Sequence, residues 1–294
     1  MRREVRVPVC TVWSSPDAPR DVDEAAVRDV PDVAGWAASM GRDVRLGLHG
    51  RTETQLLLGE PVVVGDEQDG WSRIVAPWQR STGRADGYPG WVRSAHLGEP
   101  VGPTSGPRAV VVAHTVACTT DAGDELELSL GTTLPVHTAG EGSVTVLLPD
   151  ARRATLPRSS LRLSRGDDDV LAVARSFVGL RYLWGGTSAW GVDCSGLVHL
   201  AWRSQGLLLP RDAYEQADTP LVEPVSLDAV RPGDLYFFAR PGQRIYHVGF
   251  VTRPVTESGE RWMLHAPEGG ELVEDAPLAP HRVETLVGAG RVRA

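Results

Sequence analysis

The chain has 294 residues, which is enough for two or three domains of ordinary size. Its apolar content of 41% and its charged content of 23% are typical of a globular protein with a buried core. The formal net charge of −8 argues against a nucleic-acid partner and against adsorption to an anionic membrane, because no basic excess is present to neutralise phosphates.

The cysteine usage and the N-terminus bound the cellular setting. Cys10, Cys118 and Cys194 lie far apart, which fits neither a disulfide framework nor a metal knuckle. Inert packing is the ordinary role of a lone cysteine, and we assign it to Cys10 and Cys118. The N-terminal MRREVRVPVCTVW lacks the continuous apolar stretch of a signal peptide, and no window approaches the roughly 18 apolar residues of a membrane span. We therefore expect a cytoplasmic protein.

The first 165 residues consist of short β-type runs between turn residues, which is typical of small barrels or sandwiches. One helix is expected at 22–40, inside an acidic insertion, with Pro31 interrupting it. Residues 102–107 are rich in Gly, Pro and Ser and form the expected linker. The pattern predicts two all-β units, at 1–102 and 107–165.

From residue 166 the pattern changes to helices followed by strands. Three aspartates at 167–169 supply the cap and first-turn acids of one helix. A second helix is expected from Cys194 to about Ser204, with Gly206 at its end. Helices first and antiparallel-looking strands afterwards indicate an α+β domain at 166–294. Its strands are expected at residues 234–239, 245–252, 261–266 and 271–274.

Cys194 differs from the other two cysteines in its surroundings. A glycine-rich approach leads to the start of the predicted helix, where unpaired N–H groups and the helix dipole favour a thiolate. A nucleophilic thiolate needs a histidine partner, and that partner needs an orienting group. His247 and His265 lie in strand-like runs that adjacent antiparallel strands would bring together. Taken alone, His247 in an apolar strand is more often a core histidine than a catalyst, so composition leaves both interpretations open.

The order of several sequence blocks resembles a known family. The segment YLWGGTSAWGVDCSGLV is similar to the signature of NlpC-type papain-like cysteine peptidases. The resemblance continues through LPRDAYEQ, RPGDLYFF, HVGFV and LHAP in the family's order, covering nearly all of residues 167–294. It implies a papain-like fold, hydrolysis of cell-wall peptides after D-γ-glutamyl residues, and no metal or organic cofactor. Cys194 matches the nucleophile, His247 the general base and His265 the orienting third residue.

The two β units resemble bacterial SH3-like domains, which in many such enzymes serve only as wall anchors. The first unit, with TETQLLLGE and GYPGWV, is instead similar to the domain that caps the active-site groove of dipeptidyl-peptidase VI-type members. The resemblance implies that Glu53, Tyr88 and Asp193 bind the free amine of L-Ala-γ-D-Glu peptides. It further implies that Tyr182 contacts substrate or polarises the oxyanion.

Three nearby residues have two interpretations each. Ser195 resembles a substrate-contacting position and is equally compatible with a polar first-turn residue. Arg211 and Asp212 either line the site or brace a loop through a salt bridge, and bracing is the better expectation.

The sequence therefore predicts a cytoplasmic cysteine peptidase that cleaves the γ-D-glutamyl–diamino acid bond of free murein stem peptides during recycling. The partner is a murein-derived peptide, with no nucleic acid and no membrane. An exported endopeptidase acting on intact wall and an inactive wall-binding SH3-like protein are the alternatives.

Overall fold

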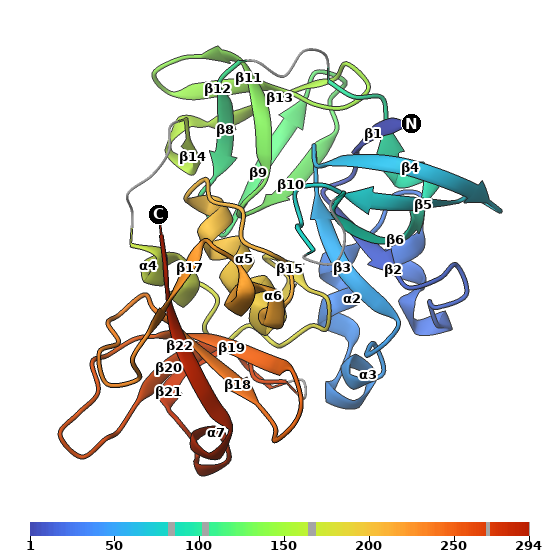
Figure 1. The fold of residues 1–294 in the computed structure, drawn as a ribbon. Helices are drawn as coiled ribbons and strands as arrows, with labels where there is room; N and C mark the ends of the chain where they lie inside the picture. The colour runs from blue at the N-terminus through green and yellow to red at the C-terminus, as the bar shows by residue number, and fades with distance from the viewer. Residues whose placement is uncertain (82–85, 102–105, 164–168, 269–270, 294) are drawn as a thin grey trace.

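The computed structural model describes residues 1–81, 86–101, 106–163, 169–268 and 271–293 (Figure 1). Most of the predicted linker at 102–107 and the predicted boundary between 165 and 166 lie outside these residues. The chain forms two β modules and an α+β domain, as the sequence predicts.

The first β module is a seven-stranded antiparallel sheet with strand order β3-β2-β6-β5-β4-β1-β7. Its core includes the buried side chains of Val12, Leu56 and Ile74. The strands are β1 (Arg2–Val5), β2 (Val9–Trp13), β3 (Thr52–Leu57), β4 (Pro61–Gln68), β5 (Trp71–Ala76), β6 (Tyr88–Arg93) and β7 (Leu97–Gly98).

The acidic insertion lies between β2 and β3. The expected helix at 22–40 is divided at Pro31 into α1 (Glu24–Val27) and α2 (Val33–Ser39), followed by α3 (Arg42–Leu46). Asp32 caps α2 by accepting a hydrogen bond from the Gly35 N–H at 2.7 Å. The Trp36 indole donates to buried Asp23 at 2.9 Å, which joins α2 to the start of the insertion.

The second β module repeats the topology of the first. Its order is β10-β9-β13-β12-β11-β8-β14. When the strands of each module are numbered from 1 to 7 in chain order, both modules have the order 3-2-6-5-4-1-7. In both modules a short 3₁₀ turn, Ser94–His96 or Arg158–Ser160, precedes the last strand. The strands are β8 (Arg108–Val111), β9 (Thr115–Thr120), β10 (Glu125–Ser129), β11 (Thr133–Ala139), β12 (Ser143–Leu147), β13 (Arg153–Pro157) and β14 (Leu161–Arg162).

The α+β domain begins with α4 (Val170–Arg175), which Asp169 caps, and continues through the hairpin β15 (Thr187–Ser188) and β16 (Gly191–Val192) to α5 (Cys194–Ser204). Its six-stranded sheet has the order β17-β22-β18-β19-β20-β21. The remaining elements are α6 (Ala213–Asp218), β17 (Val222–Val225), β18 (Leu235–Ala239), β19 (Ile245–Val251), β20 (Trp262–His265), β21 (Glu274–Pro277), α7 (Pro280–Thr285) and β22 (Leu286–Val292).

Most of the expected elements of this domain are confirmed, and one is displaced. The strand expected at 271–274 is β21, which begins at Glu274. Its bounds follow from its partner, because Trp262–His265 of β20 pair with Glu274–Pro277. Helices α6 and α7 and strands β15, β16, β17 and β22 were not expected. Each is short or interrupted by glycine, so its sequence pattern is weak.

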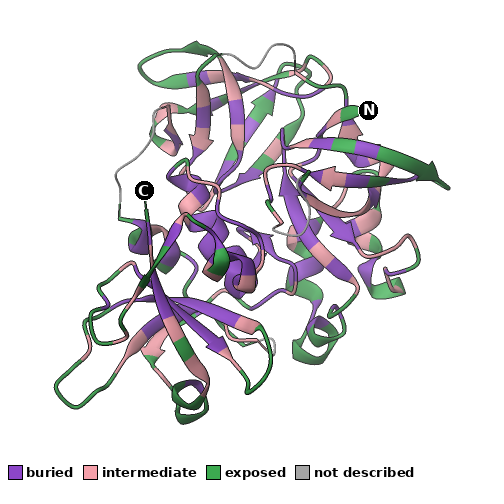
Figure 2. Ribbon diagram, viewed as in Figure 1, coloured by how far each residue is buried: buried purple, intermediate pink, exposed green. Residues whose placement is uncertain are grey.

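Helix α5 lies at the centre of the molecule, between the two β modules and the six-stranded sheet, and it is almost entirely buried (Figures 1 and 2). Its residues Leu197, Val198 and Leu200 join a core that also includes Trp13 of the first module and Leu130 of the second. One shared core therefore fixes the three parts around the start of α5. None of the helices in the described ranges has the length and apolar character of a membrane span.

Candidate active site

The start of α5 carries Cys194 as its first helical residue. Asp193 is the N-cap, and its carboxylate accepts a hydrogen bond from the Gly196 N–H at 2.7 Å. The N–H of Cys194 belongs to the first helical turn, whose amides lack intrahelical acceptors. The thiol therefore lies beside an available amide donor.

Glycines permit the tight approach of the preceding loop to this helix. A Cβ on Gly196 would lie 2.1 Å from the Gly186 carbonyl oxygen, and a Cβ on Gly186 would lie 2.4 Å from the Gly191 carbonyl oxygen. Larger residues at these two positions would push the loop away from Cys194, which explains the glycines of WGGTSAWGVDCSG.

Two histidines lie on neighbouring strands of the sheet that packs against α5. His247 of β19 and His265 at the end of β20 are both buried, and His247 Nε2 lies 2.7 Å from His265 Nδ1. The predicted adjacency of the two imidazoles on antiparallel strands is thereby confirmed. His247 Nδ1 has no hydrogen-bond partner among the described residues.

Strand β19 also reaches the nucleophile. The backbone N–H of Val248, the residue after His247, is hydrogen-bonded to the Cys194 thiol. Burial, followed by the Asp193 carboxylate, raises the pKa of Cys194 to about 12, and so opposes the thiolate that the helix start favours. Burial and the neighbouring His265 lower the pKa of His247. Burial therefore favours the neutral form of both the thiol and the imidazole.

A cavity of about 400 Å³ opens at Cys194 and is lined by both the α+β domain and the first β module. All five residues predicted to bind substrate line it, namely Glu53, Tyr88, Tyr182, Asp193 and Ser195. His265 instead borders a second cavity, of about 450 Å³. Glu268 lines both cavities and so marks where they adjoin.

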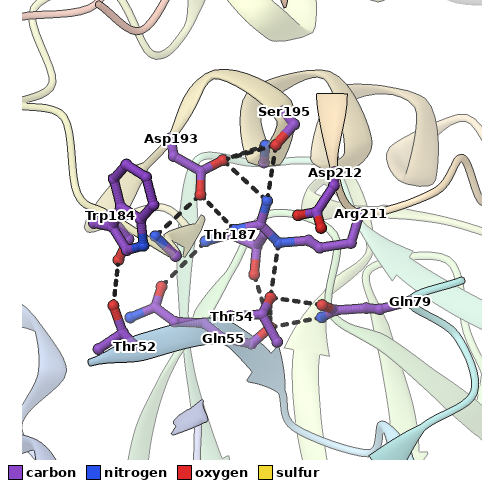
Figure 3. A network of polar contacts seen from close by, with 12 residues as sticks. Thr52, Thr54, Gln55, Gln79, Trp184, Thr187, Asp193, Ser195, Arg211 and Asp212 are labelled. Carbon is purple, nitrogen blue, oxygen red and sulfur yellow. Dashed lines mark hydrogen bonds and ion pairs between the residues drawn. The ribbon is translucent and has the colours of Figure 1, made fainter. Parts of the chain in front are cut away.

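Asp193 is engaged by a buried network rather than open to the cavity alone (Figure 3). Arg211 donates to its two carboxylate oxygens at 3.0 and 2.6 Å, and the Gly185 N–H donates to it at 3.0 Å. Burial by itself would lower the pKa of Arg211, but the charge of Asp193 and its hydrogen bonds, together with Asp212 and Tyr88, outweigh burial and raise it. The expectation that Arg211 braces a loop is confirmed, with Asp193 as its partner.

The same network holds the first β module against the nucleophile helix (Figure 3). Arg211 Nε donates to Thr54 Oγ1 of β3 at 2.8 Å, and Thr187 Oγ1 donates to the Gln55 carbonyl at 2.7 Å. Ser195 donates to Asp193 at 3.2 Å and accepts from Arg211 at 3.0 Å, so its hydroxyl also belongs to this network.

Asp212 is the cavity residue that the sequence interpretation undervalued. It lines the cavity beside Cys194, and the Tyr88 hydroxyl donates to its two oxygens at 3.1 Å each. Burial raises the pKa of Asp212, although Arg211 opposes that shift. The sequence signal for Asp212 was its position next to Arg211 in LPRDAYEQ. Its contact with Tyr88 could not be predicted, because only the fold brings the two residues together.

A second contact between modules lies at the other end of α5. Arg203 forms a buried ion pair with Glu60 of the first module. The guanidinium groups of Arg203 and of Arg108 from the second module lie 5.3 and 5.1 Å from the Trp78 ring centroid. The two β modules therefore pack together against the back of the nucleophile helix.

Comparisons with known proteins agree with this organisation. A model of the NlpC/P60 family matches residues 179–291, and a model of the bacterial dipeptidyl-peptidase Sh3 domain matches residues 48–97. Two proteins named gamma-D-glutamyl-L-lysine dipeptidyl-peptidase are similar over most of the chain. The one from Bacillus cereus is 31% identical over 98% of this chain and 90% of its own. The one from Bacillus subtilis is 33% identical over 90% of each.

A crystal structure of an NlpC/P60 family protein from Bacillus cereus superposes with a TM-score of 0.92 at 30% identity, covering 99% of both chains. A cysteine at the start of a buried helix, packed on a histidine-bearing antiparallel sheet, is the arrangement of a cysteine peptidase. The chain belongs to the NlpC/P60 family, with an N-terminal bacterial SH3 domain of the dipeptidyl-peptidase type.

Proposed function

We propose that this peptidase hydrolyses the γ-D-glutamyl–diamino acid bond of free murein stem peptides that begin with L-Ala, releasing L-Ala-D-Glu. The observation that carries the proposal is the shared cavity, in which Glu53 and Tyr88 of the first β module lie with Cys194. The names of the two Bacillus relatives, which are similar over both modules and the α+β domain, support the same bond.

The chemistry begins with both reacting groups neutral. The Cys194 thiol transfers its proton to the free Nδ1 of His247 as the sulfur attacks the γ-carbonyl carbon. The resulting thiolate and imidazolium attract each other strongly in a water-poor site, which compensates for the burial that disfavours each charge alone. His265 accepts a hydrogen bond from His247 Nε2 and orients the ring.

The tetrahedral intermediate places negative charge on the former carbonyl oxygen. The N–H of Cys194 at the start of α5 is one donor to this oxygen, and the buried Tyr182 hydroxyl, which lines the same cavity, is a second. Protonated His247 then donates its proton to the departing amine, and the C–N bond breaks. His247 next removes a proton from water, which hydrolyses the thioester and restores the thiol.

The first β module provides selectivity for a free amine. Glu53 and Asp212 place two carboxyl groups in the cavity, and Tyr88 connects the first module to Asp212. An ammonium removed from water is stable only when it is paired with opposite charge, so this end of the cavity favours an unmodified N-terminal L-Ala. Asp193 contributes to amine binding indirectly, because both of its carboxylate oxygens accept hydrogen bonds from Arg211.

Such selectivity fits a cytoplasmic enzyme that recycles imported wall fragments. Stem peptides still attached to glycan carry an amide in place of the amine, so an endopeptidase of intact wall would need to accept them. Hydrolysis of L-Ala-γ-D-Glu-L-Lys and of its meso-diaminopimelate analogue, each with and without N-acetylation, tests the proposal by product mass spectrometry. We expect cleavage of the free peptides only. Equal cleavage of the acetylated peptides would favour the wall endopeptidase, and no cleavage of any peptide would favour a wall-binding protein.

A further inference from the structure

A fourth residue extends the row of side chains that begins at His247. His265 Nε2 lies 3.3 Å from Glu274 Oε1. The two residues stand directly opposite each other on antiparallel strands β20 and β21, so the backbone register itself sets their contact. His265 is buried, whereas half of the Glu274 side chain is exposed to the second cavity.

The chemistry of the carboxylate decides which nitrogens carry protons. An ionised carboxylate only accepts hydrogen bonds, so His265 donates from Nε2 and, when neutral, keeps a lone pair on Nδ1. The 2.7 Å contact then requires that His247 Nε2–H donates to His265 Nδ1. His247 consequently keeps its lone pair on Nδ1, the buried nitrogen with no partner among the described residues.

The opposite arrangement would be inactive. If His265 carried its proton on Nδ1, it would donate to His247 Nε2, and His247 would be protonated on Nδ1. That nitrogen could not accept the thiol proton. We propose that Glu274 is a positioning residue that sets the tautomers of His265 and His247 and so makes His247 Nδ1 the base. This inference rests on the proposed roles of Cys194, His247 and His265.

Other charged groups near the pair do not supply this function. His281 and Arg282 of α7 act on both histidines electrostatically and lower their pKa values, whereas Glu274 raises that of His265. Among the described residues, neither His281 nor Arg282 accepts a hydrogen bond from His265 Nε2, whose partner is Glu274. The hydrogen bond in turn lowers the pKa of Glu274, which keeps the carboxylate ionised over the working pH range.

The test compares Glu274→Ala and Glu274→Gln with a control, Glu271→Gln. Glu271 borders the same cavity and forms an exposed ion pair with Arg42, so the control removes one nearby negative charge without touching the histidines. Nitrogen-15 NMR of histidine-labelled full-length protein reports ring tautomers directly. Steady-state kinetics on L-Ala-γ-D-Glu-L-Lys across pH reports their consequence.

We expect the parent protein to carry its ring protons on Nε2 of both histidines. In Glu274→Ala the tautomers should become mixed and kcat should fall roughly ten-fold with little change in KM, as for loss of one hydrogen bond to a charged group. The acid limb of the pH profile of Glu274→Ala should move to lower pH, because the carboxylate no longer stabilises the positive charge on the His265–His247 pair. In Glu274→Gln the amide oxygen still accepts, so the tautomers and most of kcat should be retained. The control should match the parent.

The inference is overturned if the parent carries its His265 proton on Nδ1, or if Glu274→Ala matches the control in tautomers, kcat and pH profile. Thermal melting of each variant identifies loss of folding as a separate cause. If the parent shows the expected tautomers but cleaves no peptide, the proposed function fails while the role of Glu274 in setting the tautomers stands.

Discussion

Tyr88 of the first β module donates a hydrogen bond to both oxygens of Asp212 in the α+β domain, at 3.1 Å each. This contact crosses the boundary between the two parts inside the cavity that contains Cys194. The cavity wall is thus completed only when the first module is docked, and the buried Arg211 network fixes that docking.

Replacing Tyr88 with Phe removes this hydroxyl and leaves the ring in place. We expect KM for L-Ala-γ-D-Glu-L-Lys to rise about three- to ten-fold, the effect of losing one hydrogen bond worth about 1 kcal/mol, because Asp212 is no longer oriented. The melting temperature should change little, since Tyr88 is only half buried. Unchanged KM in Tyr88→Phe would remove the first module from substrate binding.

Neutralising the acidic end should weaken discrimination between free and acetylated peptides. In the double variant Glu53→Gln, Asp212→Asn, kcat/KM for the free peptide should fall at least about ten-fold, because the ammonium loses its charged partners. The acetylated peptide, which has no ammonium, should lose much less. The ratio of the two kcat/KM values is the measurement, and a ratio equal to that of the parent would contradict amine recognition at this end.

Arg211→Met should be severely destabilising. The substitution leaves Asp193 buried without its cation and removes the link to Thr54, which typically costs about 3–5 kcal/mol of unfolding free energy. Arg28→Gln breaks a largely exposed ion pair with Glu24 and should cost less than about 1 kcal/mol. Urea unfolding of both variants checks the difference, and similar losses would argue that the network is not a main support of the docked module.

A buried histidine away from the site should make stability depend on pH. Burial lowers the pKa of His199 to about 3, whereas the unfolded residue titrates near 6.5, so the unfolded state binds one more proton between these values. The unfolding free energy should therefore decrease as pH falls through this window. His199→Asn keeps a donor for the Leu209 carbonyl but does not titrate, so its slope should be smaller by about 1.4 kcal/mol per pH unit between pH 6 and 4. Parallel slopes would contradict a neutral, buried His199.

Local signals were sufficient to predict the nucleophile helix. The spacing of the apolar residues and Gly206 after the last turn predict the helix over Cys194–Ser204, and the structure has those bounds. The strand-like runs that contain HVGFV and WMLH likewise predict the adjacent histidines. The helix and the adjacent histidines depend on residues within one element or on two neighbouring strands, so the local sequence pattern is enough to predict them.

Contacts between distant segments could not be predicted in this way. The pairing of Arg211 with Asp193 and Thr54, and that of Tyr88 with Asp212, join residues that approach one another only after the modules dock. The effect of burial on Cys194 has the same origin. A helix N-terminus favours the thiolate, whereas burial by the surrounding modules, which no local pattern encodes, raises the pKa of the thiol. The identical strand order of the two β modules was also hidden, because topology is preserved without obvious sequence repetition.

The most direct test is the mass spectrum of products formed from free L-Ala-γ-D-Glu-L-Lys by the parent protein and by Cys194→Ala. We predict that the parent releases L-Ala-D-Glu and lysine, and that the variant, folded to the same melting temperature, releases neither above background. Undiminished hydrolysis by Cys194→Ala would show that the bond is broken by a group other than this thiol.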